Sequence, residues 1–124
     1  LIDVPGASAY VRGGIVAYDN EIKKTRLGVS ADTLAAVGAV SQEVVEQMAR
    51  GVRAALDADC GIATSGIMGP GGGSDEKPVG TAWIAICTPE KARSIKVMMH
   101  HDRLGNKARA ATTALDLLRR AILT

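Results

Sequence analysis

The sequence is poor in residues that support several common functions. Its 124 residues include no Phe, two Tyr, one Trp and two Cys. Few aromatics and a net charge of only +2, with no basic run, give little support to nucleic-acid binding. Two cysteines do not make a disulfide framework, and no apolar run approaches the length of a membrane span. We therefore expect a cytoplasmic protein that engages neither nucleic acid nor a membrane.

What the sequence does contain is enough apolar material for the core of one domain. Hydrophobic residues make up 47% of a chain of single-domain length. Without Phe, that core must consist mainly of Ala, Val, Ile, Leu and Met side chains.

The stretch Cys60–Cys87 organises the rest of the chain. Its flanks, Ile62–Ser65 and Thr81–Cys87, are continuous apolar runs that predict neighbouring strands buried on both faces. Between them, Gly66–Gly73 holds five glycines and Pro70 within eight residues, which excludes both helix and strand. Such a loop lets backbone N–H groups approach an anion or a carbonyl oxygen. The alternative is a mobile connector.

The remaining patterns predict an α/β layered domain with a mixed β-sheet flanked by helices. The elements are a strand over Tyr10–Tyr18, helices over Glu21–Leu27 (capped by Asp19 or Asn20), over Ser30–Gly38 and from Ser41 onward, a half-exposed strand over Ser94–His100, and a final helix from Asp102 or Asn106. We expect the helix after Ser41 to bury Val44, Val45, Met48, Val52, Ala55 and Leu56, and the final helix to bury Leu104, Ala108, Ala111, Leu115, Leu118 and Ile122.

Several kinds of catalytic site are poorly supported. His100 and His101 are adjacent on a predicted strand and must point to opposite faces, so we expect no metal site. The glycine loop lacks the Gly-Lys-Ser/Thr ending of a nucleotide P-loop, and it opens no helix as a dinucleotide-binding loop does. Cys60 has no positive neighbour in the sequence that would activate its thiol.

Lysine chemistry is the more interesting interpretation. Lys23 falls in the first turn of a predicted helix, where the helix dipole disfavours a positive charge and burial would lower the pKa of the amine further. A neutral amine there would be able to act as a base, with Ser8 as its nucleophile and Tyr18 as a relay. The alternative is that Lys23–Arg26 is a solvated helix face and that Ser8 is a turn residue. The residues alone leave both open.

Five segments of the chain resemble a single family. They are Gly6–Tyr10, Tyr18–Lys23, Gly38–Ser41, Ser65–Gly73 and Glu76–Thr81. Taken in this order, they resemble the CinA carboxy-terminal domain family, the nicotinamide-nucleotide amidases, which deamidate nicotinamide mononucleotide. The similarity runs from the start of the chain to the final helix.

The resemblance implies roles for particular residues. It makes Ser8 the nucleophile, Tyr18 its supporting phenol and Lys23 the base. It places substrate contacts at Ala9, Asn20, Ser65, Gly66, Gly72 and Arg103. The chain departs from the family pattern at Met68, where Ala is common, and at Lys107, where an arginine is expected.

The resemblance also implies a reaction. Neutral Lys23, directly or through Tyr18, would take the Ser8 proton as Oγ attacks the carboxamide carbon of nicotinamide mononucleotide. Backbone N–H groups around Ser8 or in the glycine loop would stabilise the oxyanion. No cofactor or metal is implied, and we expect a homo-oligomer such as a dimer. The competing class is a non-catalytic nucleotide-binding or dimerisation module of a larger CinA-like protein.

A site of this kind places demands on the fold. The loop Gly66–Gly73 should lie at the same end of the sheet as Ser8, because an oxyanion- or phosphate-binding loop is of no use elsewhere. Family members also carry an upstream strand and helix with a Thr-Ala-Glu-Ser-Cys-Thr-Gly-Gly segment. We therefore expect residues 1–124 to form a single domain that starts near the end of that helix.

Overall fold

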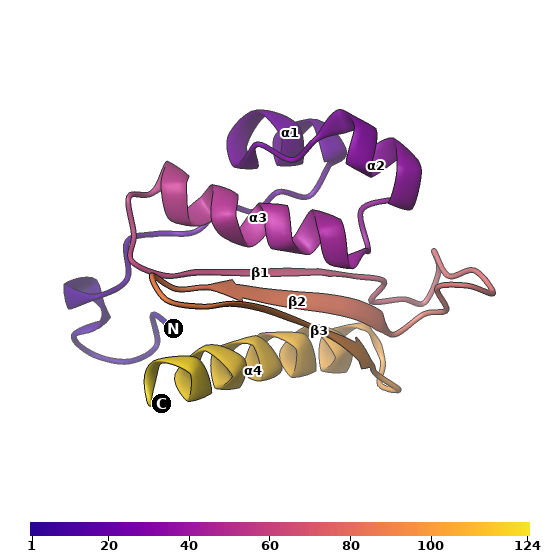
Figure 1. Ribbon diagram of the computed structural model, residues 1–124. Helices are drawn as coiled ribbons and strands as arrows, with labels where there is room; N and C mark the ends of the chain where they lie inside the picture. Colours follow the sequence, from indigo (N-terminus) through magenta and orange to yellow (C-terminus); the bar gives the residue numbers. More distant parts are fainter.

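The fold is a small sheet between two layers of helices (Figure 1). The computed structural model describes all residues, 1–124. Helix α3, with α1 and α2 outside it, covers one face of the sheet, and α4 covers the other. The predicted α/β layered architecture is therefore confirmed. In chain order the elements are the 3-10 helix η1 (Ala7–Ala9), α1 (Asn20–Leu27), α2 (Ala31–Val37), α3 (Gln42–Ala55), β1 (Gly61–Gly66), β2 (Thr81–Cys87), β3 (Ala92–Met98) and α4 (Arg103–Ile122).

Short polar side chains start the helices close to the predicted positions. Oδ1 of Asp19 accepts a hydrogen bond from the Ile22 N–H at 2.8 Å, so Asp19 and not Asn20 caps α1. Ser30, Ser41 and Asp102 cap α2, α3 and α4 in the same way. Each cap satisfies an N–H group that the helix itself leaves unpaired. No helix of the structure combines the length and apolarity needed to cross a membrane.

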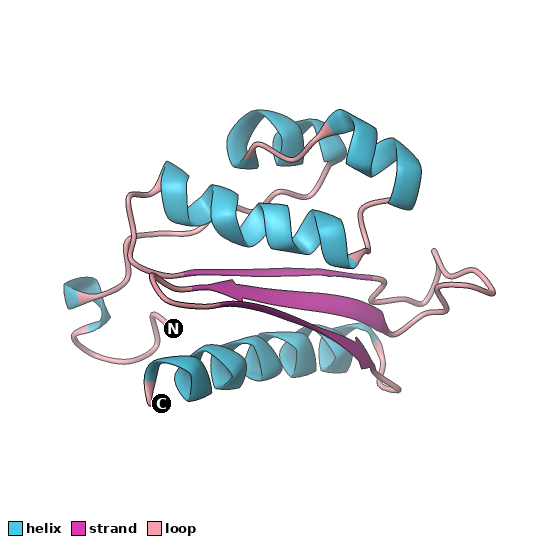
Figure 2. Cartoon of the chain, in the orientation of Figure 1, coloured by secondary structure: helices cyan, strands magenta, loops and turns pink.

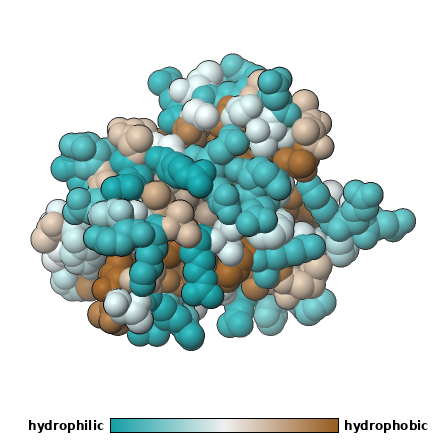
Figure 3. All heavy atoms as spheres, in the orientation of Figure 1, coloured by the Kyte–Doolittle hydropathy of each residue, from teal (hydrophilic) through white to brown (hydrophobic).

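The core divides into two parts because successive residues of a strand face opposite sides of the sheet. On one side, Ala85 and Cys87 of β2 join the cluster under α3, where Val44 and Val45 are fully buried. On the other side, the β2 isoleucines pack against α4. In Figure 3 polar side chains predominate on the visible face, and apolar atoms show mainly low in the view, where α4 lies in Figure 1.

Helix α1 packs closely on α3 at a glycine. A Cβ atom at Gly51 would overlap the backbone carbonyl of Leu27 at the end of α1. We expect Gly51→Ala to destabilise the protein by about 1–3 kcal/mol or more, because backbone on both sides must move apart. Denaturant unfolding measures this loss. Gly71→Ala is the matched control, since a Cβ there meets nothing within 4 Å, and equal stability losses for the two variants would contradict the prediction.

The sheet differs from the predicted one. Its strand order is β1-β2-β3 and both pairs are antiparallel, so the prediction of a mixed sheet is wrong. The predicted pairing of the two central runs is confirmed, since Ile62 lies opposite Ile86. Strand β2 is buried on both faces as expected. Strand β1 instead forms an edge of the sheet and exposes Thr64.

The predicted strand over Tyr10–Tyr18 is absent. Residues 11–18 are irregular and cross the molecule as a loop beside α3 (Figure 2). Ile15 and Ala17 pack against the core, and Val16 between them is 88% exposed, so the alternation typical of a strand is present. What is missing is a partner, because residues 12–18 make no backbone–backbone hydrogen bond. The side-chain alternation correctly predicted which residues face the core, but it did not predict that the segment has no neighbouring strand to pair with.

The apolar stripe of α4 is also displaced from its predicted position. Leu104 and Ile122 are 75% and 59% exposed, so the predicted stripe is wrong. The fully buried Asn106 fixes the rotation of the helix and turns a neighbouring set of residues toward the sheet. The residues that α4 buries are Asn106, Ala110, Ala114 and Leu117.

Candidate functional site

Lys23 is the one buried lysine of the chain, with 6% of its surface exposed. Its side chain turns inward from α1, and Nζ donates hydrogen bonds to the carbonyl oxygens of Ala17 at 2.8 Å and Tyr18 at 3.3 Å. Burial lowers the pKa of this amine below its ordinary value, and the nearby Asp19 carboxylate opposes part of the shift. The inward orientation and the direction of the shift agree with the prediction that Lys23 can lose its proton.

The other charges of α1 leave the Lys23 amine without a salt bridge. Glu21 pairs instead with Lys24, with 2.7 Å between Nζ and Oε2. Both of these side chains are partly or largely solvated, so this pair adds little stability. Adjacent lysines on one helix turn therefore have different surroundings, one buried and one at the surface.

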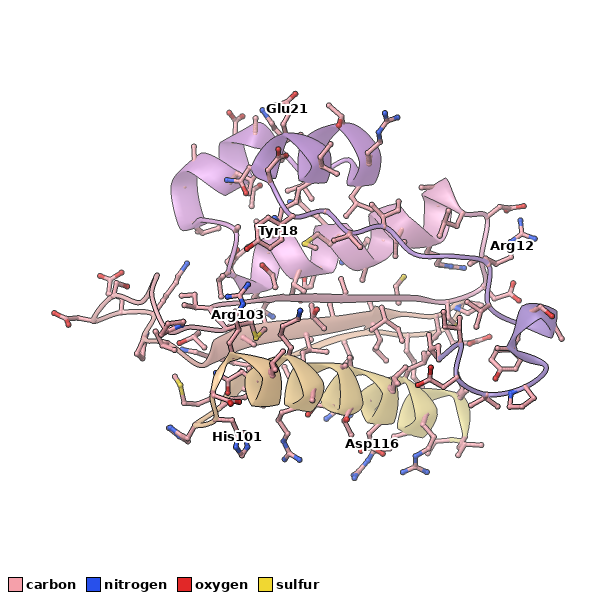
Figure 4. All side chains as sticks on the ribbon, turned by 180° about the vertical axis from the view of Figure 1, so that it is seen from behind. Arg12, Tyr18, Glu21, His101, Arg103 and Asp116 are labelled. Carbon is pink, nitrogen blue, oxygen red and sulfur yellow. The ribbon has the colours of Figure 1, made fainter.

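Tyr18 and Arg103 meet at the end of the sheet where β1 runs into the glycine loop. Nη2 of Arg103 donates to the Tyr18 hydroxyl at 3.4 Å, and Nη1 donates to the Gly69 carbonyl at 2.9 Å. Figure 4 shows the two side chains pointing toward each other from the segment before α1 and from the start of α4. Arg103 thus links α4 to the glycine loop and to Tyr18, whose carbonyl accepts a hydrogen bond from Lys23.

The glycine loop presents unpaired backbone donors next to this guanidinium. The N–H groups of Met68, Gly69 and Gly71–Gly73 donate to no group of the chain. Gly69 and Gly72 have φ of 89° and 91°, a region that favours glycine. Unpaired N–H groups beside a cation are suited to bind an anionic group such as a phosphate.

Ser65 lies at the same end, at the close of β1. Its hydroxyl donates to the Ala39 carbonyl at 2.8 Å, and the residue is only 9% exposed. Nζ of Lys77 donates to the carbonyl of Val37, which ties the far side of the loop to the end of α2. The predicted contact residues Asn20, Gly66 and Gly72 lie on α1, at the end of β1 and in the loop itself, and so belong to this end of the molecule.

Asn106 holds α4 against the loop from beneath. It is fully buried, its Nδ2 donates to the Met68 carbonyl at 2.9 Å, and its Oδ1 accepts from the His101 N–H at 3.0 Å. These two bonds fix the start of α4, and with it Arg103, relative to the loop. The sequence pointed to Asn106 only as a possible helix start. Its place four and eight residues before Ala110 and Ala114, on one helix face, is the signal that would have shown its burial.

We expect Asn106→Leu to destabilise the protein despite the similar volume of leucine. The substitution leaves the His101 N–H and the Met68 carbonyl without partners, at about 1–3 kcal/mol for each unsatisfied group. Denaturant unfolding measures the loss. Lys107→Ala, at the exposed neighbouring position, should change stability by less than about 0.5 kcal/mol. An Asn106→Leu variant as stable as Lys107→Ala would show that the two hydrogen bonds contribute nothing.

Ser8 and Ala9 lie at the opposite end of the sheet. Both are exposed residues of η1, and the hydroxyl of Ser8 makes no hydrogen bond. Figure 1 shows η1 near the start of β1, whereas the glycine loop follows the end of that strand. The prediction that Ser8 and Gly66–Gly73 share one end is therefore wrong within a single chain. The physical reason is residues 11–18, which run the length of the sheet between Ser8 and Tyr18.

Comparison with known proteins identifies the family. The model of the CinA C-terminal domain matches residues 1–122. The chain belongs to this family. A CinA-like protein of Gemmatimonas aurantiaca is 46% identical over 121 residues, which are 98% of this chain and 28% of the relative. A putative competence-damage inducible protein of Caldanaerobacter subterraneus is 45% identical over 120 residues, 97% of this chain and 29% of the relative.

Solved structures of competence/damage-inducible proteins share the fold. The competence/damage inducible protein CihA from Agrobacterium tumefaciens is 36% identical with a TM-score of 0.94, and the match covers 96% of this chain and 73% of that one. A competence damage-inducible protein A from Klebsiella pneumoniae is 33% identical with a TM-score of 0.93, covering 98% and 76%. The CinA domain described here thus spans less than a third of the curated relatives named above.

Proposed function

We propose that this CinA domain is an amidohydrolase that converts nicotinamide mononucleotide and water to nicotinate mononucleotide and ammonia. The observation that carries the proposal is the buried amine of Lys23, which lies next to Tyr18 and bears a lowered pKa. A lysine held without a carboxylate partner is suited to accept a proton. Membership of the CinA family and the resemblance of the five segments support the same reaction.

In this proposal each group at the Lys23 end has a defined task. The Lys23 amine accepts the nucleophile's proton, directly or through the Tyr18 phenol. The N–H groups of the glycine loop and the Arg103 guanidinium bind the anionic parts of the substrate, its phosphate above all. Ser8 is the proposed nucleophile, and because it lies at the opposite end of the sheet from Lys23 within one chain, a second copy in the expected homo-oligomer would supply it. Its Oγ bonds to the carboxamide carbon, ammonia leaves with the transferred proton, and water then hydrolyses the ester.

The proposed reaction has a direct test. The protein is incubated with nicotinamide mononucleotide, and ammonia release is measured together with the change from carboxamide to carboxylate in the nucleotide. Nicotinamide riboside, which lacks the phosphate, is the matched control and should react much more slowly. Absence of ammonia release from nicotinamide mononucleotide with the wild-type protein would overturn the proposal.

The lowered pKa of Lys23 predicts the pH dependence of turnover. Below this pKa the amine is protonated and cannot act as a base. As the pH rises through it, the neutral form appears, so kcat/KM should rise and level off below the ordinary lysine value of 10.5. Initial rates of ammonia release between neutral and alkaline pH check the prediction. A rate that falls over this range would contradict the assignment of Lys23 as the base.

A second candidate is a non-catalytic nucleotide-binding or dimerisation module. The observation that favours it is the separation, within one chain, between η1, which carries Ser8, and the far end of residues 11–18, where the Ala17 and Tyr18 carbonyls accept from Lys23. Such a module would bind nicotinamide mononucleotide at the loop and Arg103 without releasing ammonia. Calorimetry on the wild-type protein, run beside the ammonia assay, distinguishes the two functions.

A further inference from the structure

The outer strand of the sheet, β3, has a free edge. The strand order β1-β2-β3 leaves one side of β3 without a neighbouring strand. Residues 92–98 form no backbone hydrogen bond outside their pairing with β2, so every second residue points its N–H and C=O groups away from the sheet. Helix α4 packs mainly on β1 and β2, which leaves β3 only partly covered on that face. An open edge of this kind is a template for another extended chain.

A small groove lies between β3 and the flank of α4. Its volume is about 190 Å³, below the roughly 300–1,000 Å³ of small-molecule sites. Leu117 belongs to the buried cluster on which Ile95 packs, so the groove has an apolar base. A side chain with an apolar stem and a charged end fits such a place. The residues that line the groove are Arg93 and Ile95 of β3 and Thr113, Asp116, Leu117 and Arg120 of α4.

The rim of this groove is positive. Arg93 is exposed and forms no salt bridge with any carboxylate of the chain. Arg119 and Arg120 share the one carboxylate of Asp116, at 2.9 Å and 2.7 Å. In Figure 4 Asp116 projects from α4 on the opposite side of the sheet from Glu21 of α1. One carboxylate among three arginines leaves a net positive charge, and the guanidinium of Arg93 is free to bind an anion.

The positive charge of the whole chain is concentrated in this layer. Residues 88–124 carry eight Lys or Arg and three Asp or Glu, a net charge of +5. Residues 1–87 carry seven and ten, a net charge of −3, which together give the +2 of the chain. Charges on an edge strand protect it from aggregation, and Arg93 and Lys96 serve that purpose. Arg109 and the other cations of α4 lie off the strand, so they suit instead a partner of opposite charge.

We propose that the β3 edge and its groove bind an extended acidic segment of a partner protein. The segment adds a strand to β3 through main-chain hydrogen bonds, and its alternate side chains point toward α4. A glutamate there lays its methylene groups over Ile95 and Leu117 and places its carboxylate on Arg93. A single-stranded nucleic acid would find no stacking partner, because residues 88–124 contain no Phe, Tyr or Trp. The proposal does not depend on the deamidation chemistry.

A labelled peptide as long as β3, in which Glu and Val alternate, tests the binding. Its fluorescence anisotropy should rise on addition of the wild-type protein, and added salt should reverse the rise. The same peptide with Lys in place of Glu should not bind. No binding of the Glu peptide at millimolar protein, or equal binding of the Lys peptide, overturns the proposal.

Two further peptides test the added strand. One is N-methylated at its Glu amides and the other at its Val amides. An added strand points only one of these sets toward β3, so one peptide should lose binding and the other should keep it. If both bind like the parent peptide, the attraction is electrostatic alone and the free edge takes no part.

Arg93→Glu tests the surface itself. It should weaken binding of the Glu peptide by roughly tenfold or more, because the carboxylate meets a like charge in place of its partner. Arg26→Glu makes the same charge change at an exposed arginine of α1, and should bind within about twofold of the wild type. Equal losses in the two variants overturn the proposal. A short DNA duplex that binds more tightly than the Glu peptide, and is released in Arg93→Glu, would assign the surface to nucleic acid instead.

Discussion

Replacing Lys23 by Ala should lower the rate of deamidation by roughly 10²–10⁴-fold, the contribution of a positioned general base. The amine is the one buried basic group beside Tyr18, and it bonds only to backbone carbonyls. Lys23→Arg should be as inactive as Lys23→Ala, because a guanidinium stays protonated at any pH the protein tolerates. Ammonia release at saturating nicotinamide mononucleotide measures the effect.

Lys24 provides the matched control for Lys23. It follows Lys23 directly on the same helix, carries the same charge, and pairs at the surface with Glu21. Lys24→Ala should therefore leave turnover near the wild-type rate and stability within about 1 kcal/mol. Near-normal turnover in Lys23→Ala, or equal losses in the two variants, would show that Lys23 is not the base.

Lys23→Met separates the loss of the amine from the loss of packing. Methionine keeps most of the buried stem but cannot accept a proton. Lys23→Met should be as inactive as Lys23→Ala while remaining better folded. A folded Lys23→Met variant with high activity would assign proton transfer to another group.

The parts of the fold that depend on local chemistry were predictable from the sequence. Caps such as Ser30 and Ser41 act on N–H groups three residues away, and a glycine such as Gly28 ends a helix through its own φ of 69°. Each of these inferences needed only a few neighbouring residues. The residues around Lys23, by contrast, left open whether its amine is buried or belongs to a solvated helix face, and only the resemblance favoured its role as a base.

The parts that depend on distant partners were not predictable in this way. Residues 10–18 have the composition and alternation of a strand, but a strand also needs a neighbour to pair with. The place of Ser8 depends on the direction in which this segment crosses the sheet, which no local pattern encodes. The rotation of α4 was set by Asn106, whose two bonds to Met68 and His101 replace the apolar contact that a stripe of leucines would predict.

Replacing Ser8 by Ala should reduce turnover by on the order of 10⁴-fold or more, as for other enzymes that lose a covalent nucleophile. The residue is exposed and its hydroxyl makes no hydrogen bond, so the fold and the affinity for the nucleotide should be unchanged. Steady-state ammonia release and calorimetric binding measure the two effects. Thr112→Ala, which removes an exposed hydroxyl from α4, should retain the wild-type rate.

Ser65→Ala distinguishes the two serines that the chain offers. Ser65 lies at the Lys23 end, but its hydroxyl is already donated to Ala39, so its loss should weaken substrate binding more than it slows the chemical step. Ser8→Ala should do the reverse, with kcat lost and binding kept. If Ser65→Ala alone abolishes kcat, the nucleophile and the base come from one chain, and neither Ser8 nor a second copy takes part in the chemistry.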